Sequence, residues 1–284
     1  MATVQTFQHM RPRLMAIAYR MLGSFTEAED AVQDAWLRWQ AIDETDVRDP
    51  AAWLATAVSR ICIDRLTSAR SRREAYPGEW LPEPVITSEP IDAESVSLGL
   101  LVVLERLNPT ERAAFVLHKV FDYSHREVGE ILGMTEATTR QLCHRAQLHV
   151  TEQRPRFQAS REQHERLLGA FASALVSGRI EDLERVLAAD ATLWADGGGK
   201  VRGAAGRSLH GAAPIAKFFQ GLVAKAVVAP DQVLAVRVVN GWPALVGSSG
   251  GQVNAVITIE TDGERITAIR NVVNPDKLAL RSLS

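Results

Sequence analysis

The stretch SHREVGEILGMTEATTRQLCHRAQ, residues 124–147, decides the fold of half of this chain. Ser124 can cap a helix, and Glu127 stands three residues later, as a capping box requires. Gly133 permits a tight turn, and Thr135 can cap a second helix directly after it. Two short helices joined by a glycine turn are the pattern of a DNA-binding helix-turn-helix.

The chain before this motif has helical periodicity. Residues 96 to about 123 hold two apolar helical segments. They are separated at Asn108-Pro109, where a proline breaks the first helix and a neighbouring polar residue can cap the second. Residues 1–75 predict three more helices: one before Gly23, a second capped by Thr26, and a third that starts near Pro50 and ends in arginines. We therefore expect two all-helical domains, residues 1–75 and 96–155.

Residues 76–95 differ from both helical domains in composition. They contain five acidic residues, no Lys or Arg, and prolines at 77, 82, 84 and 90. Such a segment predicts an extended, acidic linker. Trp80 and Leu81 are large apolar groups within it, so we expect this part of the linker to dock on another surface.

Residues 160–284 change character again. Two helical stretches lead to a glycine run at 197–199, and a further helix follows at about 211–225. Four Val- and Ile-rich runs then alternate with glycine turns, which predicts consecutive antiparallel strands. The expected fold is therefore multidomain: two all-α domains, then an α+β cone in which a sheet wraps over a helix.

Composition excludes several classes of protein. The chain has 284 residues, 46% of them hydrophobic and 23% charged, as in ordinary globular proteins. No apolar stretch reaches the roughly 20 residues of a membrane span, and the first residues do not resemble a secretion signal. Cys62 and Cys143 stand far apart, so we expect no disulfide scaffold, no metal and no cofactor, and a reducing cytosol. The net charge of −2 predicts weak DNA binding by the chain alone.

Three segments of the first half carry a family resemblance. They are AYRMLGSFTEAEDAVQDAWLRW (18–39), DPAAWLATAVSRICIDRLTSARSRR (49–73) and LNPTERAAFVLHKVFDYSHREVGEILGMTEATTRQLCHRA (107–146). Together they resemble bacterial extracytoplasmic-function (ECF) sigma factors of the sigma-70 family. Residues 160–284 resemble SnoaL-like, NTF2-like domains, and WLPEP, DGGGK and NPDKL look like the signature segments of sigma factors with that extension.

The resemblance implies a non-enzymatic transcription initiation factor, regulated in cis by its C-terminal domain. Its implied partners are core RNA polymerase and promoter DNA, with no membrane and a monomeric state. An acidic helix face suits a basic clamp on the polymerase, although by itself such a face is more often simply solvated. The implied core-polymerase contacts are Glu29, Asp30, Gln33, Asp34 and Leu37.

Promoter contacts are implied for two sets of residues. Opening the −10 element needs a polar pocket for an unstacked base and cations for the backbone, whereas arginines at a helix end alone fit its dipole equally well. The implied −10 set is Arg48, Asp49, Arg60, Arg65, Arg70 and Arg73. Arg and Gln can contact base edges bidentately, and Thr139 and Cys143 are expected in the core. The implied −35 set is Glu136, Thr138, Arg140, Gln141, His144 and Arg145.

The signature segments are expected to form a regulatory docking surface. Glycines let a backbone approach closely, and the acidic linker is a natural partner within the same chain. The implied interdomain set is Trp80, Leu81, Pro82, Glu83, Pro84, Asp196, Gly197, Gly198, Gly199, Lys200, Asn274, Pro275, Asp276 and Lys277.

Two alternatives stay open from the sequence. Cone-shaped domains often enclose a pocket, and Asp196 or His210 could act as acid or base beside Trp194, although no complete acid–base constellation is evident. The chain could then be a DNA-binding module fused to an isomerase- or cyclase-type enzyme, or its pocket could bind a small molecule or peptide without chemistry. The second alternative to the sigma factor is a simple helix-turn-helix repressor.

Overall fold

The computed structural model describes residues 2–43, 46–74, 76–87, 96–153, 159–201, 204–224 and 229–283. The chain forms two compact units. The first comprises Met1–Glu74, Leu100–Arg154 and Leu283–Ser284, and the second comprises Ala75–Gly99 and Pro155–Ser282. The segment expected to be a linker therefore belongs to the same unit as the C-terminal domain.

The first unit consists of helices. They are α1 (Ala2–Leu22), α2 (Phe25–Gln40), α3 (Pro50–Glu74), α5 (Leu98–Leu104, whose last residues lie in this unit), α6 (Pro109–Phe115), the π-helix η2 (Val116–Val120), α7 (His125–Leu132) and α8 (Glu136–Gln153). Tyr19 and Trp39 are fully buried between the first three helices. Ser24, rather than the expected Thr26, caps α2 by accepting the Glu27 N–H, because the helix starts two residues earlier than predicted.

The helix-turn-helix has the predicted local chemistry. Ser124 and Glu127 form a reciprocal capping box at the start of α7. Gly133 ends that helix in the left-handed region at φ 70°, which a side-chain-free residue adopts without strain. Thr135 accepts the Thr138 N–H at the start of α8. These features were predicted correctly because each involves residues only a few positions apart.

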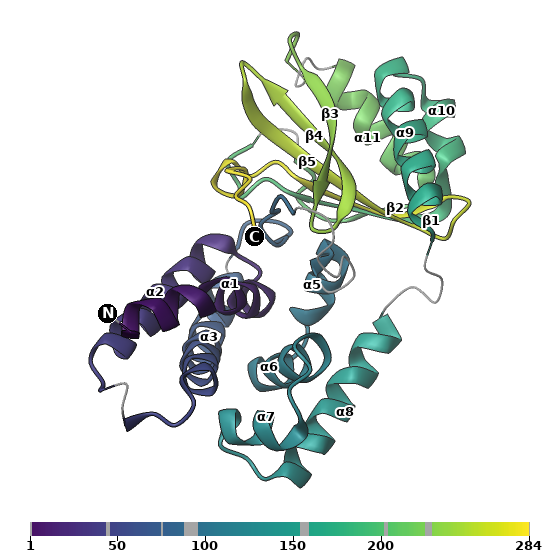
Figure 1. The fold of residues 1–284 in the computed structure, drawn as a ribbon. Helices are drawn as coiled ribbons and strands as arrows, with labels where there is room; N and C mark the ends of the chain where they lie inside the picture. The colour runs from purple at the N-terminus through teal and green to yellow at the C-terminus, as the bar shows by residue number, and fades with distance from the viewer. Residues whose placement is uncertain are drawn as a thin grey trace. The chain divides into compact units, whose positions relative to one another are not determined.

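The second unit combines three helices with a six-stranded sheet (Figure 1). Its elements are α9 (Arg161–Ser177), α10 (Ile180–Val186), β1 (Leu187–Asp196), β2 (Leu209–His210), α11 (Ala212–Ala224), β3 (Val233–Val239), β4 (Trp242–Ser249), β5 (Gln252–Thr261), β6 (Ile266–Val272) and the 3₁₀ turn η3 (Pro275–Lys277). The strand order is β2-β1-β6-β5-β4-β3, with β1 and β6 parallel and the other pairs antiparallel. The predicted four-strand meander and the α+β class are confirmed.

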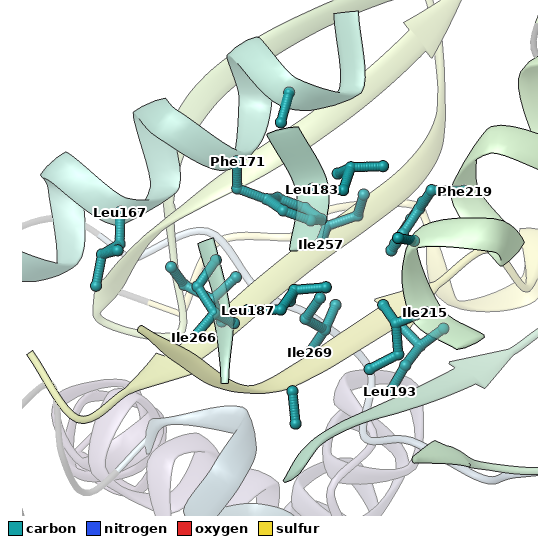
Figure 2. Packing of buried hydrophobic residues seen from close by; sticks show 14 of the residues in the cluster. Leu167, Phe171, Leu183, Leu187, Leu193, Ile215, Phe219, Ile257, Ile266 and Ile269 are labelled. Atoms are coloured by element: carbon teal, nitrogen blue, oxygen red, sulfur yellow. The ribbon is translucent and has the colours of Figure 1, made fainter. Parts of the chain in front are cut away.

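Helices α9, α10 and α11 cover one face of this sheet (Figure 1). Figure 2 shows the core between them, where Leu167 and Phe171 of α9 and Phe219 of α11 pack on apolar strand residues such as Ile257 and Ile269. Alternate residues of a strand point to opposite faces. The residues next to these core positions therefore point away from the helices, and they include Trp194, Asp196, Thr258, Glu260 and Arg270.

Candidate functional site

Helix α8 has one buried face and one free face. Thr139 and Cys143 are 0% and 2% exposed, as expected for core positions. All six residues implied as −35 contacts are exposed on the same helix. Glu136 Oε1 accepts a hydrogen bond from Arg140 at 3.0 Å, one helical turn away, so this arginine is held along the free face.

Two histidines that looked isolated in the sequence lie together beside this motif. The rings of His118 and His125 stack with centroids 4.0 Å apart. Nδ1 of His118 lies 2.8 Å from the Tyr123 carbonyl oxygen. Burial, followed by the neighbouring His118, lowers the pKa of His125. His125 is the first residue of α7, so this histidine pair lies at the start of the helix-turn-helix.

The implied polymerase and −10 sets are joined by an arginine. Arg65 of α3 donates to Asp34 at 2.6 Å and to the Glu27 carbonyl at 2.9 Å, both on α2. Asp30, Gln33 and Leu37 are exposed on α2, and Leu37 is 56% exposed despite its apolar side chain. Glu29 lies 3.9 Å from Arg11 of α1.

The remaining −10 residues lie just before α3, in its middle and near its end. Arg48 is exposed, and Asp49 accepts the Ala52 N–H at 3.0 Å, which caps the helix. Arg60 is exposed, and its Nε donates to the Ile131 carbonyl at 3.3 Å. The side chains of Arg70 and Arg73 lie outside the described residues.

A seam of arginines, which sequence reasoning missed, joins the two helical domains inside the first unit. The Arg112 side chain is 2% exposed, and its Nε and one terminal nitrogen donate to the Arg20 carbonyl at 3.1 and 3.0 Å. Its other terminal nitrogen pairs with Glu105. Arg13 donates to the Phe121 carbonyl at 3.2 Å. Each acceptor carbonyl belongs to the end of a helix, where backbone oxygens lack intrahelical partners.

Asp196 is the centre of a polar site in the second unit. Its side chain is 0% exposed. One carboxylate oxygen accepts from the Tyr76 hydroxyl at 2.6 Å and from the Gly198 N–H at 3.0 Å. The other oxygen accepts from the Leu81 N–H at 2.9 Å and from Lys277 at 2.7 Å. The carboxylate therefore binds both ends of the linker stretch 76–81.

Lys277 and Asn274 complete the site from the C-terminal side. The Lys277 ammonium also donates to the Leu81 carbonyl at 2.6 Å and lies 4.3 Å from the centre of the Trp80 ring, within cation–π range. Asn274 donates to the Tyr76 hydroxyl at 2.8 Å. Burial, followed by the hydrogen bond to Asp196, raises the pKa of Tyr76, so its hydroxyl stays protonated and donates.

The glycine run makes this packing sterically feasible. Gly198 has φ 60°, and a Cβ there would come within 2.5 Å of the Asn274 side chain. A Cβ on Gly199 would come within 2.8 Å of Pro77 of the linker. Gly197 faces Ala204 in the same way, at 2.5 Å. Each contact requires the absence of a side chain.

The other signature residues divide between buried and exposed. Leu81, Pro82, Glu83 and Pro84 are all buried, and Glu83 is only 3% exposed. Pro275 and Asp276 are exposed. Lys200 pairs with Asp276 at the surface, with side chains 55% and 63% exposed, and therefore lies outside the buried site.

The residues considered for catalysis are not brought together as an acid–base pair. His210 is exposed, and its ring nitrogens lie 3.2 Å from Thr192 Oγ1 and 3.3 Å from Ser208 Oγ. His210 pairs across the sheet with Thr192. Thr192 is four residues from Asp196 on β1, which places His210 and Asp196 about 13 Å apart along the strand direction. Over the described parts of the chain there is no cluster of three potential metal ligands and no helix suited to crossing a membrane.

Comparison with known proteins identifies the class of the helical half. A model of sigma-70 region 2 matches residues 6–72, and a model of sigma-70 region 4 matches residues 97–150. Helices α1, α2 and α3 are thus region 2 of a sigma-70-type initiation factor. The helix-turn-helix of α7 and α8 belongs to region 4. Region 2 has no place in a simple helix-turn-helix repressor, so the sigma reading prevails.

The whole chain then identifies the family. It is 37% identical to the ECF RNA polymerase sigma factor SigJ of Mycobacterium tuberculosis, over 96% of this chain and 92% of that protein. The probable ECF sigma factor SigI of the same species is 30% identical over 94% of this chain and 92% of its own. The crystal structure of M. tuberculosis SigJ superposes with a TM-score of 0.76 at 35% identity, covering 99% of this chain and all of that one. The protein belongs to the ECF sigma factors, and it directs core RNA polymerase to promoters.

Proposed function

We propose that the C-terminal domain regulates this sigma factor in cis by binding the chain between region 2 and region 4. The observation that carries the proposal is the buried Asp196 carboxylate, which holds the Tyr76 hydroxyl and the Leu81 N–H beside Lys277. A buried carboxylate that satisfies linker groups stabilises the bound linker, because an unpaired charge there would be costly.

Linker binding would act through the length of free chain. The 25 residues 75–99 could span at most about 85 Å when fully extended. Residues held on the sheet cannot contribute to that span. Region 2 and region 4 must reach two promoter elements on the polymerase, so an equilibrium between bound and released linker would set the fraction of competent sigma factor.

The promoter and polymerase contacts follow the family pattern. The exposed face of α8, with Arg140 and Gln141, is suited to the −35 major groove. The exposed positions of α2 are suited to core polymerase. Arg60 donates to the Ile131 carbonyl through Nε, so its terminal nitrogens could hold −10 DNA while this bond is kept. Because polymerase and chromosome are its partners, we place the protein in the cytoplasm.

The C-terminal domain is proposed to act as a regulator rather than as an enzyme. The Asp196 carboxylate accepts four hydrogen bonds at 2.6–3.0 Å, from Tyr76, Leu81, Gly198 and Lys277. A general base has to reach a substrate proton, and this carboxylate is occupied by the linker instead.

The test is in-vitro transcription with core RNA polymerase and DNA from upstream of the protein's own gene. The double variant Asp196→Asn/Lys277→Met removes both buried charges with little change in shape. We expect about tenfold faster hydrogen exchange at the Leu81 amide and a severalfold rise in transcript. Lys200→Met/Asp276→Asn is the matched control, since it removes an exposed ion pair from the same two loops.

Two outcomes separate the alternatives, and one further variant controls for folding. Faster exchange with higher output in the first variant alone supports regulation through the linker. Faster exchange with unchanged output, at equal protein level, would contradict it. Tyr76→Phe, which deletes only a hydroxyl on the linker side, guards against an effect on the folding of the domain and should shift both readouts in the same direction by less.

A further inference from the structure

The turn between β3 and β4 carries a buried polar residue that belongs to no signature segment. Asn240 is 1% exposed and has φ 51°, in the left-handed region. Its side-chain oxygen accepts the Val85 N–H at 3.1 Å, and its side-chain nitrogen donates to the Val96 carbonyl at 2.8 Å. Its backbone N–H donates to the Val85 carbonyl at 2.9 Å. One amide thus holds the chain at two places eleven residues apart.

Backbone pairing extends this contact along the sheet edge. Ile86 bridges Val239, the last residue of β3, in antiparallel fashion, and it bridges Ser282 in parallel fashion. The Thr87 N–H donates to the Val238 carbonyl at 3.3 Å, and the Thr87 hydroxyl accepts the Gly241 N–H at 2.8 Å. The linker therefore adds a short piece of strand to the edge strand β3, a mode of recognition that uses main-chain atoms.

A third contact lies where the chain enters α5. A Cβ on Gly99 would stand 1.7 Å from Glu260 Oε1, so a side chain at position 99 would displace the Glu260 carboxylate. Glu260 is held in place by Arg270, whose guanidinium donates to it at 2.8 Å and lies 5.2 Å from the centre of the Trp194 ring. These three side chains are on the sheet face away from α9, α10 and α11.

We infer that the C-terminal domain has a second linker-binding site, formed by the Asn240-Gly241 turn and the Glu260–Arg270 pair. Its ligand is the main chain of residues 85–87 and 96–99, and Asn240 is the positioning residue. The site is chemically distinct from the Asp196 site, which uses a carboxylate and an ammonium. It holds the chain at residues 96–99, where region 4 begins, and its effect on transcription rests on the regulation proposed above.

The chemistry of position 240 leaves little choice of residue. The site needs a donor and an acceptor on one short side chain, and a backbone that tolerates positive φ. Asparagine meets all three requirements. Glycine adopts the same backbone conformation but lacks the side-chain amide. Aspartate keeps a side-chain acceptor for the Val85 N–H but offers no donor to the Val96 carbonyl.

The test uses the full chain and three variants. Asn240→Gly removes both side-chain bonds at a backbone conformation that glycine accepts. Gly99→Ala attacks the same site from the linker side. Asp231→Asn is the matched control, because Asp231 holds the far β4–β5 turn through Ser249 and Gly250, away from the linker. Hydrogen exchange is followed at Val85, Thr87 and the amides of α5, with Leu81 reporting on the Asp196 site, and transcription is measured in parallel.

We expect about tenfold faster exchange at Val85 and Thr87 in Asn240→Gly, faster exchange in α5 in Gly99→Ala, and no such change in Asp231→Asn. In Asn240→Asp, hydrogen exchange should accelerate more in α5 than at Val85, because the acceptor is kept and the donor is lost. A merely structural role in the turn would not produce this difference between the two exchange rates. Both linker-releasing variants should raise transcript at least twofold.

Unchanged exchange at Val85, Thr87 and α5 in both variants would overturn the second site. Faster exchange with normal output, while Asp196→Asn/Lys277→Met raises output, would overturn only its part in transcription and leave the proposed regulation standing. If every variant releases the linker and none changes output, the proposed regulation itself is wrong.

Discussion

The arginine seam of the first unit and the linker sites of the second unit both satisfy backbone polar groups, but they do so with side chains of different chemistry. In the seam, Arg112, Arg60 and Arg13 donate to backbone carbonyls at helix ends. In the linker sites, Asp196 and Asn240 accept backbone N–H groups of an extended segment. Helix ends expose carbonyls and an extended chain exposes both kinds of group, so the type of backbone on offer selects the side chain.

The comparison also separates permanent from reversible contacts. Arg112 is nearly inaccessible and bonded by all of its nitrogens, whereas Arg60 and Arg13 make single bonds at more exposed positions. A buried cation is costly to leave unpaired, so Arg112 is the residue on which the seam depends most. The linker sites spread their binding over two chemically different groups, which suits the reversible binding proposed above.

The largest effect is expected at Arg112. Replacing it with Met leaves Glu105 and the Arg20 carbonyl without their partner and should destabilise the first unit by about 3–5 kcal/mol. Urea unfolding followed by circular dichroism measures this loss. Arg126→Met, at an exposed ion pair with Glu130, should cost less than about 0.5 kcal/mol; equal losses in the two variants would remove the distinction between seam and surface.

The next effect is expected at Asp196. Asp196→Asn alone removes the buried carboxylate that pairs with Lys277 and should cost the second unit about 3 kcal/mol. Lys277→Met added to it should recover part of that loss, because the cation of the buried pair is then removed as well. A double-mutant cycle in urea gives the coupling directly, and additive losses would mean that the two side chains do not act as a pair.

A smaller effect is expected at the glycine run. Gly198→Ala forces a Cβ against Asn274 at φ 60° and should cost about 2–3 kcal/mol, with faster exchange at Leu81. Gly250→Ala is the matched comparison, since its φ is 57° and nothing lies within 4 Å of the added atom. That variant should cost only about 1 kcal/mol, the strain of the backbone alone. Similar costs would show that Asn274 yields to the methyl group.

The smallest effect concerns pH and the core of the second unit. His164 is 4% exposed with Nε2 2.8 Å from the Pro243 carbonyl, and burial lowers its pKa. The unfolded chain therefore takes up the proton first, so stability is constant above about pH 6.5 and falls below it, until the folded protein also protonates. The slope is at most about 1.4 kcal/mol per pH unit. Urea unfolding between pH 5 and 8 should show this loss in the native chain and not in His164→Gln; parallel curves would contradict it.

Local chemistry explains what could be predicted. The capping box of α7, the turn at Gly133 and the alternation of the last four strands involve residues close in sequence, so pattern alone predicts them. Asn240-Gly241 likewise indicates a hairpin turn. Its hold on Val85, 155 residues away, leaves no local signal. Arg112 and Arg20 are 92 residues apart, and an arginine in a helix predicts nothing about a distant carbonyl.

The sequence by itself determined the sigma regions, the cone domain and the segments that meet around Asp196. Only the tertiary structure decided which charges pair there. Parallel pairing of β1 with β6 brings the chain after Val272 to the end of β1, where the Val273 and Asn274 N–H groups donate to the Asp196 carbonyl. That register carries Lys277 to the buried carboxylate and leaves Lys200, four residues from Asp196 in sequence, with Asp276 at the surface. A cation can be buried at low cost only where its other hydrogen bonds are also made. Closeness in sequence does not provide those hydrogen bonds.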